Sequence, residues 1–333
     1  MRIIKDLKLR YRFLQRFSQL GVCYIRDFGW KAAIFAAYPL RMTWEETNLQ
    51  LNRQILKVVQ KQYEEIIRDS FTTPVKETSF DPNTLPCWVF WWQGEENAPE
   101  IVQICLDSIR KHAGTHPVIL LTQDNLFDYI QIPEHILQKL WEGKITLTHF
   151  SDIVRCRLLY SYGGIWADAT IYCTGEIGNE LRDYPFYSIK DGNFPASISH
   201  SKWDAFFLMA HPGLPLFRCM NELFDAYWRD YDYRACYLLV DVFLTAAYEQ
   251  DAETQKMIDN IPFNNQGVRM LAKTINDPFD ANRFEEILKM ANLHKLSYKI
   301  PWNHGCGQKN TYDYLCEMKS LHQNSSGEKS LSG

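Results

Sequence analysis

The chain has 333 residues, a length that fits about two domains or one large α/β unit. Hydrophobic residues make up 46% and charged residues 23%, so global disorder, collagen-like and low-complexity architectures are excluded. The net charge is −4, but residues 1–41 carry a net charge of +7 and the remainder a net charge of −11. The acidic body excludes nucleic-acid binding by bulk electrostatics, whereas the basic end suits an anionic surface.

The cysteines and the N-terminal residues indicate the cellular compartment in which the protein is expected. Nine cysteines are present, an odd number, and none stands in a C-x-x-C pair. This argues against a zinc ribbon and a disulfide framework, and reduced thiols in a cytosolic compartment are the simplest reading. No secretory signal is visible, and the longest early apolar run, Ala32–Tyr38, is too short to span a bilayer. We expect a cytoplasmic protein, soluble or peripheral to a membrane.

Residues 1–41 alternate basic and bulky apolar side chains, which predicts a basic amphipathic helix. An ordinary helix packed on the body, with a solvated charged face, explains the same pattern equally well. A second helix is predicted from Thr43, which forms a capping box with Glu46. Prolines mark 71–86 as a linker. We expect a helical extension over 1–80, a main domain over 81–320 and a disordered tail over 321–333.

The main domain alternates predicted strands and helices, which indicates an α/β sheet with right-handed crossovers. Its helices are expected from Asn97, Pro99 and Glu100 to about Lys111, at 134–141, near 151–161 with a stop at Gly163 and Gly164, and at 213–230 and 234–250. Its strands are expected at Cys87–Trp92, Val118–Thr122, Ile165–Tyr172, Phe186–Ile189, Phe206–Met209 and Leu296–Ile300.

Residues 149–175, HFSDIVRCRLLYSYGGIWADATIYCTG, carry the most chemistry. Asp152 and Arg155 are three apart and share a helix face, with Asp152 in the first turn near the positive end of the dipole. Strand alternation places Trp166, Asp168 and Thr170 together. A carboxylate in such an apolar strand is costly to bury unless it is paired or binds a metal. Two readings explain Asp168 equally well. In one it binds a metal that bridges a diphosphate, and in the other it forms a structural ion pair with Arg155.

This segment resembles the core motif of glycosyltransferase family 32 and its capsular-polysaccharide-synthesis branch. The family shows S-D-x-x-R, then L-x-x-x-G-G, then an aromatic residue, one further residue and D-x-D. Segments 88–109, 237–244 and 294–299 resemble flanking parts of the same branch, so the resemblance covers roughly residues 85–300. The matching motif residues are Ser151, Asp152, Arg155, Leu159, Gly163, Gly164, Trp166 and Asp168.

The resemblance implies a GT-A-like fold, an α/β Rossmann-related mixed sheet with helices on both faces, here with the N-terminal helical extension. It implies a hexosyltransferase that moves a sugar from a nucleotide-sugar to a capsule or lipopolysaccharide-type glycan, free or lipid-linked, with retention of configuration. Because such acceptors are commonly built on lipid carriers, the basic end would hold the enzyme peripherally at the inner face of the cell membrane.

The resemblance also implies Mn²⁺ or Mg²⁺ at Asp168. Thr170 replaces the second carboxylate of D-x-D, so water and phosphate oxygens would complete the metal site. His304 is a further candidate for metal or phosphate. Asp152 and Arg155 would hold sugar hydroxyls.

The remaining candidates concern the acceptor and the nucleotide. Asp241 would face the acceptor, with a capping or paired aspartate as the plainer reading. The implied nucleotide residues are Trp88 or Trp91 as a stacking platform, if they are not simply core, with Gln93, Gly94 and Trp166 nearby.

A different class of function is also compatible with the sequence. In that reading Thr170 marks lost catalysis, and the chain is a degenerate, transferase-like binding or scaffold protein of the polysaccharide machinery.

Overall fold

The computed structural model describes residues 2–37, 42–74, 79–193, 197–300, 302, 304–305 and 307–319; the side chains of residues 2–10, 12–14, 16 and 17 are not among them. A five-stranded sheet with the order β2-β1-β3-β6-β5 forms its centre. β1 pairs in parallel with β2 and β3, whereas β6 runs antiparallel to both β3 and β5. The strands are β1 (Cys87–Phe90), β2 (Val118–Leu121), β3 (Gly164–Ala167), β5 (Phe186–Ser188) and β6 (Phe207–Ala210).

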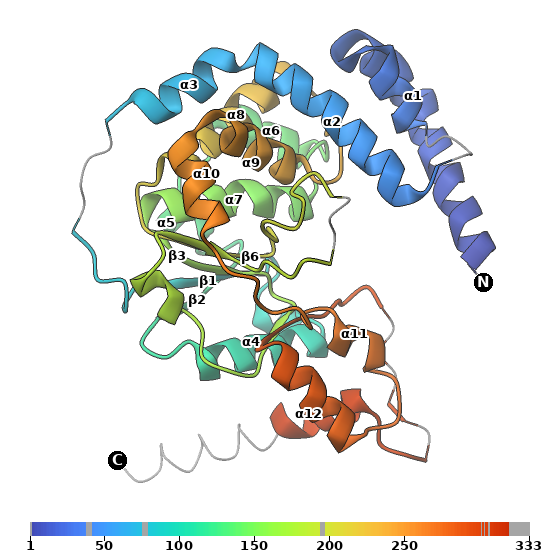
Figure 1. The fold of residues 1–333 in the computed structure, drawn as a ribbon. Coiled ribbons are helices and arrows are strands. Elements are labelled where there is room, and N and C mark those ends of the chain that lie inside the picture. The colour runs from blue at the N-terminus through green and yellow to red at the C-terminus, as the bar shows by residue number, and fades with distance from the viewer. Residues whose placement is uncertain are drawn as a thin grey trace.

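Helices cover both faces of this sheet, which confirms the expected mixed α/β class (Figure 1). α4 (Glu100–His112) lies on one face. The other face carries α6 (Glu134–Trp141), α7 (Leu147–Ser161), α8 (Pro215–Asp230) and α9 (Leu239–Gln250), with α5 (Leu126–Tyr129) and α10 (Ala252–Asp259) beside the sheet. α9 is apolar on nearly all sides because it lies between α8 and the N-terminal helices.

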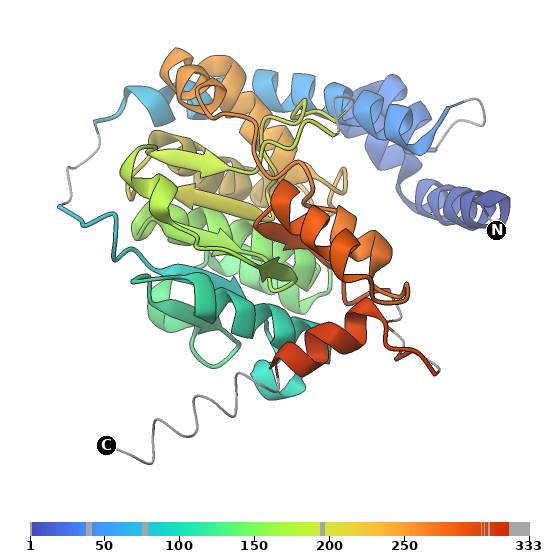
Figure 2. The same ribbon diagram turned by 60° about the horizontal axis from the view of Figure 1, so that its bottom comes forward.

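The N-terminal helices are α1 (Arg2–Ala36), α2 (Trp44–Gln62) and α3 (Glu64–Thr72). The capping box of Thr43 and Glu46 is confirmed. α2 packs against α1 and α9, and α3 packs against α8, so the boundary expected near residue 80 divides helices that share one core. α1 kinks at Gly29, where φ is +80°, and its N-terminal end stands apart from the body (Figures 1 and 2).

The segment predicted as one strand, Ile165–Tyr172, is two strands in two sheets. β3 ends at Ala167, residues 168–170 turn, and the Ile171 N–H donates to the Asp168 carbonyl at 2.9 Å. β4 (Ile171–Cys173) then pairs antiparallel with β7 (Leu293–Lys295). The prediction of one continuous alternating face is therefore wrong, because the aspartate favours a turn over the middle of a strand.

Other boundaries also differ from the predictions, among them that of the helix expected at 234–250, which begins at Leu239. α7 begins at Leu147 with Thr146 as its cap, so Asp152 lies in the second turn. The last strand ends at Lys295, and 296–300 is not a strand. α4 begins after Pro99, while the Asn97 side chain turns back to the Gln93 carbonyl.

The C-terminal part adds α11 (Met270–Thr274), α12 (Ala281–Met290) and a helix over 311–319 that lies beside α4 (Figure 2). The Tyr312 hydroxyl donates to the Glu100 carboxylate at 2.6 Å and ties this helix to α4. The tail expected over 321–333 lies outside the described residues. No described helix is both long enough and apolar enough to cross a bilayer.

Candidate functional site

Three segments meet at one edge of the sheet. β1 and β3 are parallel, so the residues that follow them, Trp91 and Asp168, belong to the same carboxyl edge. β7 reaches this edge through its pairing with β4, which begins just after the turn at Asp168. Lys295 is the last residue of β7. The candidate site is built around Asp168 and Lys295.

Asp168 accepts hydrogen bonds on both carboxylate oxygens. Oδ2 accepts from Lys295 Nζ at 2.7 Å, and Oδ1 accepts from Arg155 Nη2 at 3.3 Å and from Trp166 Nε1 at 3.1 Å. Burial raises the pKa of Asp168, but Lys295 and Arg155 outweigh that effect and hold the pKa below its ordinary value. Asp168 is therefore an anion, and the ion pair with Arg155 that the sequence left open is present.

Arg155 lies between two carboxylates on the same helix face, as its spacing from Asp152 predicts. Its Nη2 is 3.1 Å from Oδ1 of Asp152, its Nε donates to the Ser151 carbonyl at 3.3 Å, and its Nη1 donates to the Ala205 carbonyl. The guanidinium also lies 5.0 Å from the centroid of the Trp166 ring. With only 4% of its surface exposed, Arg155 is fixed by its partners.

Asp152 has a second partner besides Arg155. Its Oδ2 is 3.2 Å from Nδ1 of the buried His149, whose Nε2 in turn accepts from Trp228 Nε1 at 3.1 Å. A chain of contacts thus runs from Trp228 through His149, Asp152 and Arg155 to Asp168.

Sequence reasoning missed a second charged cluster beside this chain. Arg269 is 2.8 Å from Oδ1 of Asp204 and 2.6 Å from Oδ2 of Asp191. Both Arg269 and Lys295 lie about 5 Å from the centroid of the Phe206 ring, at 5.1 and 5.0 Å, so this ring joins the two clusters. No local motif signals this cluster, because Arg269 lies more than 60 positions along the chain from both aspartates.

Asp241 lies in the first turn of α9 and is buried. Its Oδ1 accepts from Trp203 Nε1 at 2.9 Å, so the paired reading is realised. Burial raises its pKa to about 7, with the nearby charges of Asp204 and Asp152 adding to the effect and the Trp203 bond opposing it. Asp241 therefore holds a proton for part of the time at neutral pH. Its role toward an acceptor stays a prediction.

Of the two tryptophans predicted to stack on the nucleotide, one is buried in the core and the other is partly exposed. Trp88 is 1% exposed, donates from Nε1 to the Gly163 carbonyl at 2.9 Å and packs on Tyr129 and Tyr162, so it takes the core role. Trp91 is partly exposed, and its ring meets that of Tyr298 edge-on at 5.2 Å. The Trp91 N–H is buried without a hydrogen-bond partner among the described residues. Trp91 is thus the better stacking candidate.

Gln93 and Gly94 follow Trp91 in an open turn. Gln93 is exposed, and Gly94 has φ +80° with nothing within 4 Å of where a Cβ would lie. Space for a ligand exists there, although the positive φ alone explains the glycine. Trp166 is 1% exposed and serves the site through its N–H on Asp168.

The predicted metal residues do not come together as a ligand set. Thr170 Oγ1 accepts from Lys295 Nζ at 2.9 Å, and His304 Nδ1 lies 2.6 Å from Oδ1 of Asp313. Within the described ranges, no group of three or more His, Cys, Asp or Glu residues is placed to hold a metal ion. One carboxylate and one hydroxyl, both bonded to Lys295, fit Mn²⁺ or Mg²⁺ poorly. Metal binding stays a prediction.

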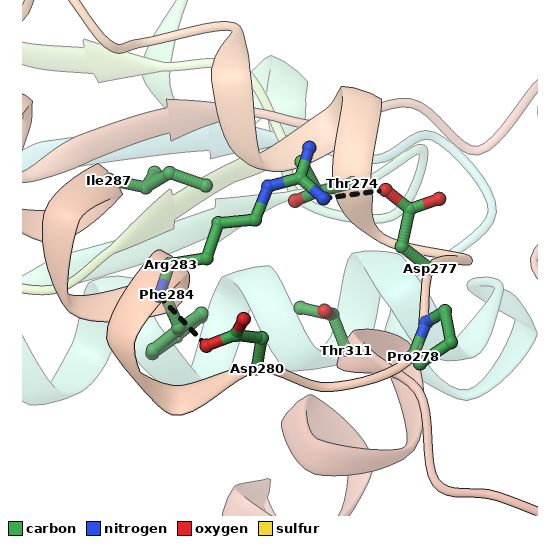
Figure 3. A pocket seen from close by; sticks show the side chains of 8 residues that line it. All are labelled: Thr274, Asp277, Pro278, Asp280, Arg283, Phe284, Ile287 and Thr311. Carbon is green, nitrogen blue, oxygen red and sulfur yellow. Dashed lines mark hydrogen bonds and ion pairs between the residues drawn. The ribbon is translucent and has the colours of Figure 1, made fainter.

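A small pocket elsewhere has a structural explanation (Figure 3). It lies at α11 and α12, where the Asp280 carboxylate caps α12 and Arg283 Nη1 is 3.0 Å from Oδ2 of Asp277. Asp168 and its partners are not among its lining residues. This pocket is the hollow left by a helix cap and an ion pair.

Ligands of open α/β sheets bind outside the carboxyl ends of the strands, and this is the edge at which the paired acidic and basic side chains lie. Residues 41–315 match the family described as "Capsular polysaccharide synthesis protein", and the chain belongs to this family.

Proteins similar to this chain are named as glycosyltransferases. The O-glycosyltransferase PaGT of Phomopsis amygdali is 27% identical over 188 residues, which cover 50% of this chain and 43% of that protein. The O-glycosyltransferase braB of Annulohypoxylon truncatum is 26% identical over 159 residues, 42% of this chain and 37% of that protein. The chain thus spans less than half the length of these relatives. A solved structure, the PaToxG glycosyltransferase, aligns at 12% identity with a TM-score of 0.36, over 72% of this chain and 94% of that chain.

Proposed function

We propose that the protein is a glycosyltransferase that moves a sugar from a nucleotide-sugar onto a capsule or lipopolysaccharide-type glycan, with retention of configuration. The observation that carries this proposal is the row Asp152–Arg155–Asp168–Lys295 at the carboxyl edge of the sheet. Membership of the capsular polysaccharide synthesis family and the names of the relatives support it.

Each group in the row has a part in the proposed transfer. Trp91, whose ring is partly exposed, would stack on the base. Arg155 and Asp152 would meet the sugar hydroxyls from the buried side. Asp168 would fix the orientation of the two cations that it pairs with. Catalysis then comes from charges that are already in place when the diphosphate departs.

Retention needs no nucleophile from the protein if the acceptor attacks from the side of the leaving group. The sequence-predicted metal would supply additional positive charge, but no step in this proposal passes through it. Asp241, whose pKa burial raises to about 7, would be able to exchange a proton at neutral pH.

The test is a donor panel with the full chain. Purified protein is incubated with UDP-, GDP- and CMP-linked sugars, and release of nucleotide is followed by chromatography with and without Mn²⁺. Hydrolysis of one donor, lost in Asp168→Asn, supports a transferase. Tight donor binding without any release of nucleotide would favour the degenerate binding protein that Thr170 suggests.

We also propose that the protein acts at the inner face of the cell membrane, on a lipid-linked acceptor. The exposed side of α1 carries large apolar residues: Val22 at 80%, Ile25 at 53%, Trp30 at 62% and Ile34 at 47% exposure. The opposite side, with Tyr24 and Phe28, is buried against the body. Together with the +7 charge of residues 1–41, this surface suits shallow insertion into an anionic bilayer.

A further inference from the structure

We propose that Lys295 is the cation that binds the donor's diphosphate, in the place that the sequence assigns to a divalent metal. This inference rests on the proposed function, because its ligand is a nucleoside diphosphate. Lys295 Nζ lies 2.7 Å from Oδ2 of Asp168 and 2.9 Å from Oγ1 of Thr170. These are the first and last positions of the D-A-T triplet, so the ammonium lies where the two residues would have held the metal.

The ammonium is fixed and still reachable. It has three N–H donors, and Asp168 and Thr170 accept two of them. The side chain of Lys295 is 24% exposed, so the third donor is accessible to a phosphate oxygen. The face of Phe206, with its centroid 5.0 Å away, further favours the positive charge. Lys295 is therefore held in position before a ligand arrives.

A divalent ion would compete with these contacts. Mg²⁺ prefers about six oxygen ligands at roughly 2.0–2.1 Å. Oδ1 of Asp168 already accepts from Arg155 and Trp166, and Oδ2 accepts from Lys295. An ion on Asp168 and Thr170 would have to displace one positive charge and lie beside the other. The threonine fits a lysine partner, because a hydroxyl accepts from an ammonium without adding a charge.

The chemistry balances without a metal. The bond between the sugar's anomeric carbon and the β-phosphate oxygen breaks, and that oxygen keeps the electron pair. A bond forms from the same carbon to the acceptor oxygen, whose proton passes to solvent. Lys295 would donate a hydrogen bond to the departing diphosphate and neutralise part of its new charge.

The experiment is calorimetric titration of the full chain with UDP, GDP, CDP and ADP, once in EDTA and once with Mn²⁺. Wild type is expected to bind one nucleotide with the same affinity, within about twofold, in both buffers. Lys295→Met is expected to lose about tenfold or more in affinity, the loss that removing one charge-assisted hydrogen bond produces. Lys295→Arg should recover part of it. Lys289→Met, which removes an exposed lysine from α12, should bind as wild type.

Thermal melts first show that each variant is folded, and Lys295→Arg gives a charged alternative if Lys295→Met is not. The inference is overturned if Mn²⁺ tightens wild-type binding tenfold or more, or if folded Lys295→Met binds as wild type. If wild type binds none of the four nucleotides in either buffer, the proposed function itself fails. Nucleotide binding that is unaffected by Lys295 leaves the proposed function standing and removes only the role of the lysine.

Discussion

Trp228 donates its indole N–H to Nε2 of His149 at 3.1 Å, and this bond decides where the imidazole carries its proton. An indole nitrogen can only donate, so Nε2 must accept. The proton is therefore on Nδ1, which donates to Asp152. Burial lowers the pKa of His149 and outweighs the opposing effect of Asp152, so the ring is neutral. A neutral imidazole, held in one orientation by Trp228 and Asp152, thus positions the Asp152 carboxylate.

We expect Trp228→Phe to destabilise the protein by about 1–3 kcal/mol, because it leaves the buried Nε2 acceptor without a donor. The proton of His149 should stay on Nδ1, which still donates to Asp152, while the ¹⁵N chemical shift of Nε2 should report the loss of its hydrogen bond. Trp141→Phe, at an exposed position of α6, is the control and should change neither quantity. An unchanged Nε2 shift in Trp228→Phe would contradict the hydrogen bond from Trp228 to His149.

Arg155→Ala is expected to cost about 3–5 kcal/mol of unfolding free energy, since it leaves the carboxylates of Asp152 and Asp168 without their shared cation. Arg110→Ala is the matched control, because it removes an exposed arginine 2.7 Å from Glu95 and should cost about 1 kcal/mol or less. Urea denaturation measures both. Equal losses in the two variants would show that the buried row contributes no special stability.

Asp168→Asn is expected to lower donor turnover by about 10²-fold or more, as loss of one preorganised electrostatic group does. It should also lower the melting temperature, because it removes a carboxylate that is paired with two cations. Replacing an unpaired buried carboxylate would instead raise the melting temperature. The pKa of Asp168 is held below its ordinary value of 3.8, so its charge stabilises the fold above that pH, and this stability is lost as the pH falls through the folded pKa. Asp277→Asn, in an exposed pair with Arg283, is the control. Near-normal turnover in Asp168→Asn would remove it from the site.

Asp241→Asn is expected to stabilise the protein increasingly between about pH 4 and pH 7. The pKa of Asp241 is raised from 3.8 to about 7, so the folded state binds more protons than the unfolded chain across this window, and wild-type stability falls as the pH rises. Asparagine has no charge to bury and still accepts from Trp203. Melting curves at pH 5 and pH 8 measure the difference, which Asp183→Asn, at an exposed position, should not show. A constant difference would contradict the raised pKa.

The wild-type chain is expected to co-sediment with anionic liposomes at low salt and to be released at high salt. Replacing Ile25 and Trp30 by serine should weaken this binding while leaving hydrolysis of a soluble donor intact. Removing residues 1–41 is a poorer test, because Tyr24 and Phe28 belong to the core and their loss would uncover it. Trp141→Ser, equally exposed but on α6, is the control. Failure of wild type to bind at low salt would make α1 a packing helix only.

Local signals predicted most elements well. The helix at 134–141, the capping box at Thr43 and the stop at Gly163 and Gly164 are present as expected, because each depends on neighbours within a few residues. The strand at 165–172 was predicted too long for a different reason. Its apolar pattern continues through Asp168, and only the pairing of β4 with a distant strand shows that the chain changes sheets there.

The site was predictable only where its residues are close in sequence. Asp152, Arg155 and Asp168 lie within one short segment and are brought together as expected. Lys295 could not be placed in the site from the sequence, because nothing near it along the chain indicates Asp168 as its partner. The pair of Arg269 and Asp204 gave no signal at all, since two separate loops supply it.

The separation between Asp168 and Lys295, 127 positions along the chain, also sets an order of assembly during synthesis. A chain that grows from its N-terminus carries Asp152, Arg155 and Asp168 long before their last cation exists. Until β7 is made, β4 presents an unpaired edge, the kind of edge that invites pairing with the wrong strand. The segment made late thus completes the site begun early, and a chain interrupted before residue 293 would carry the motif without the site.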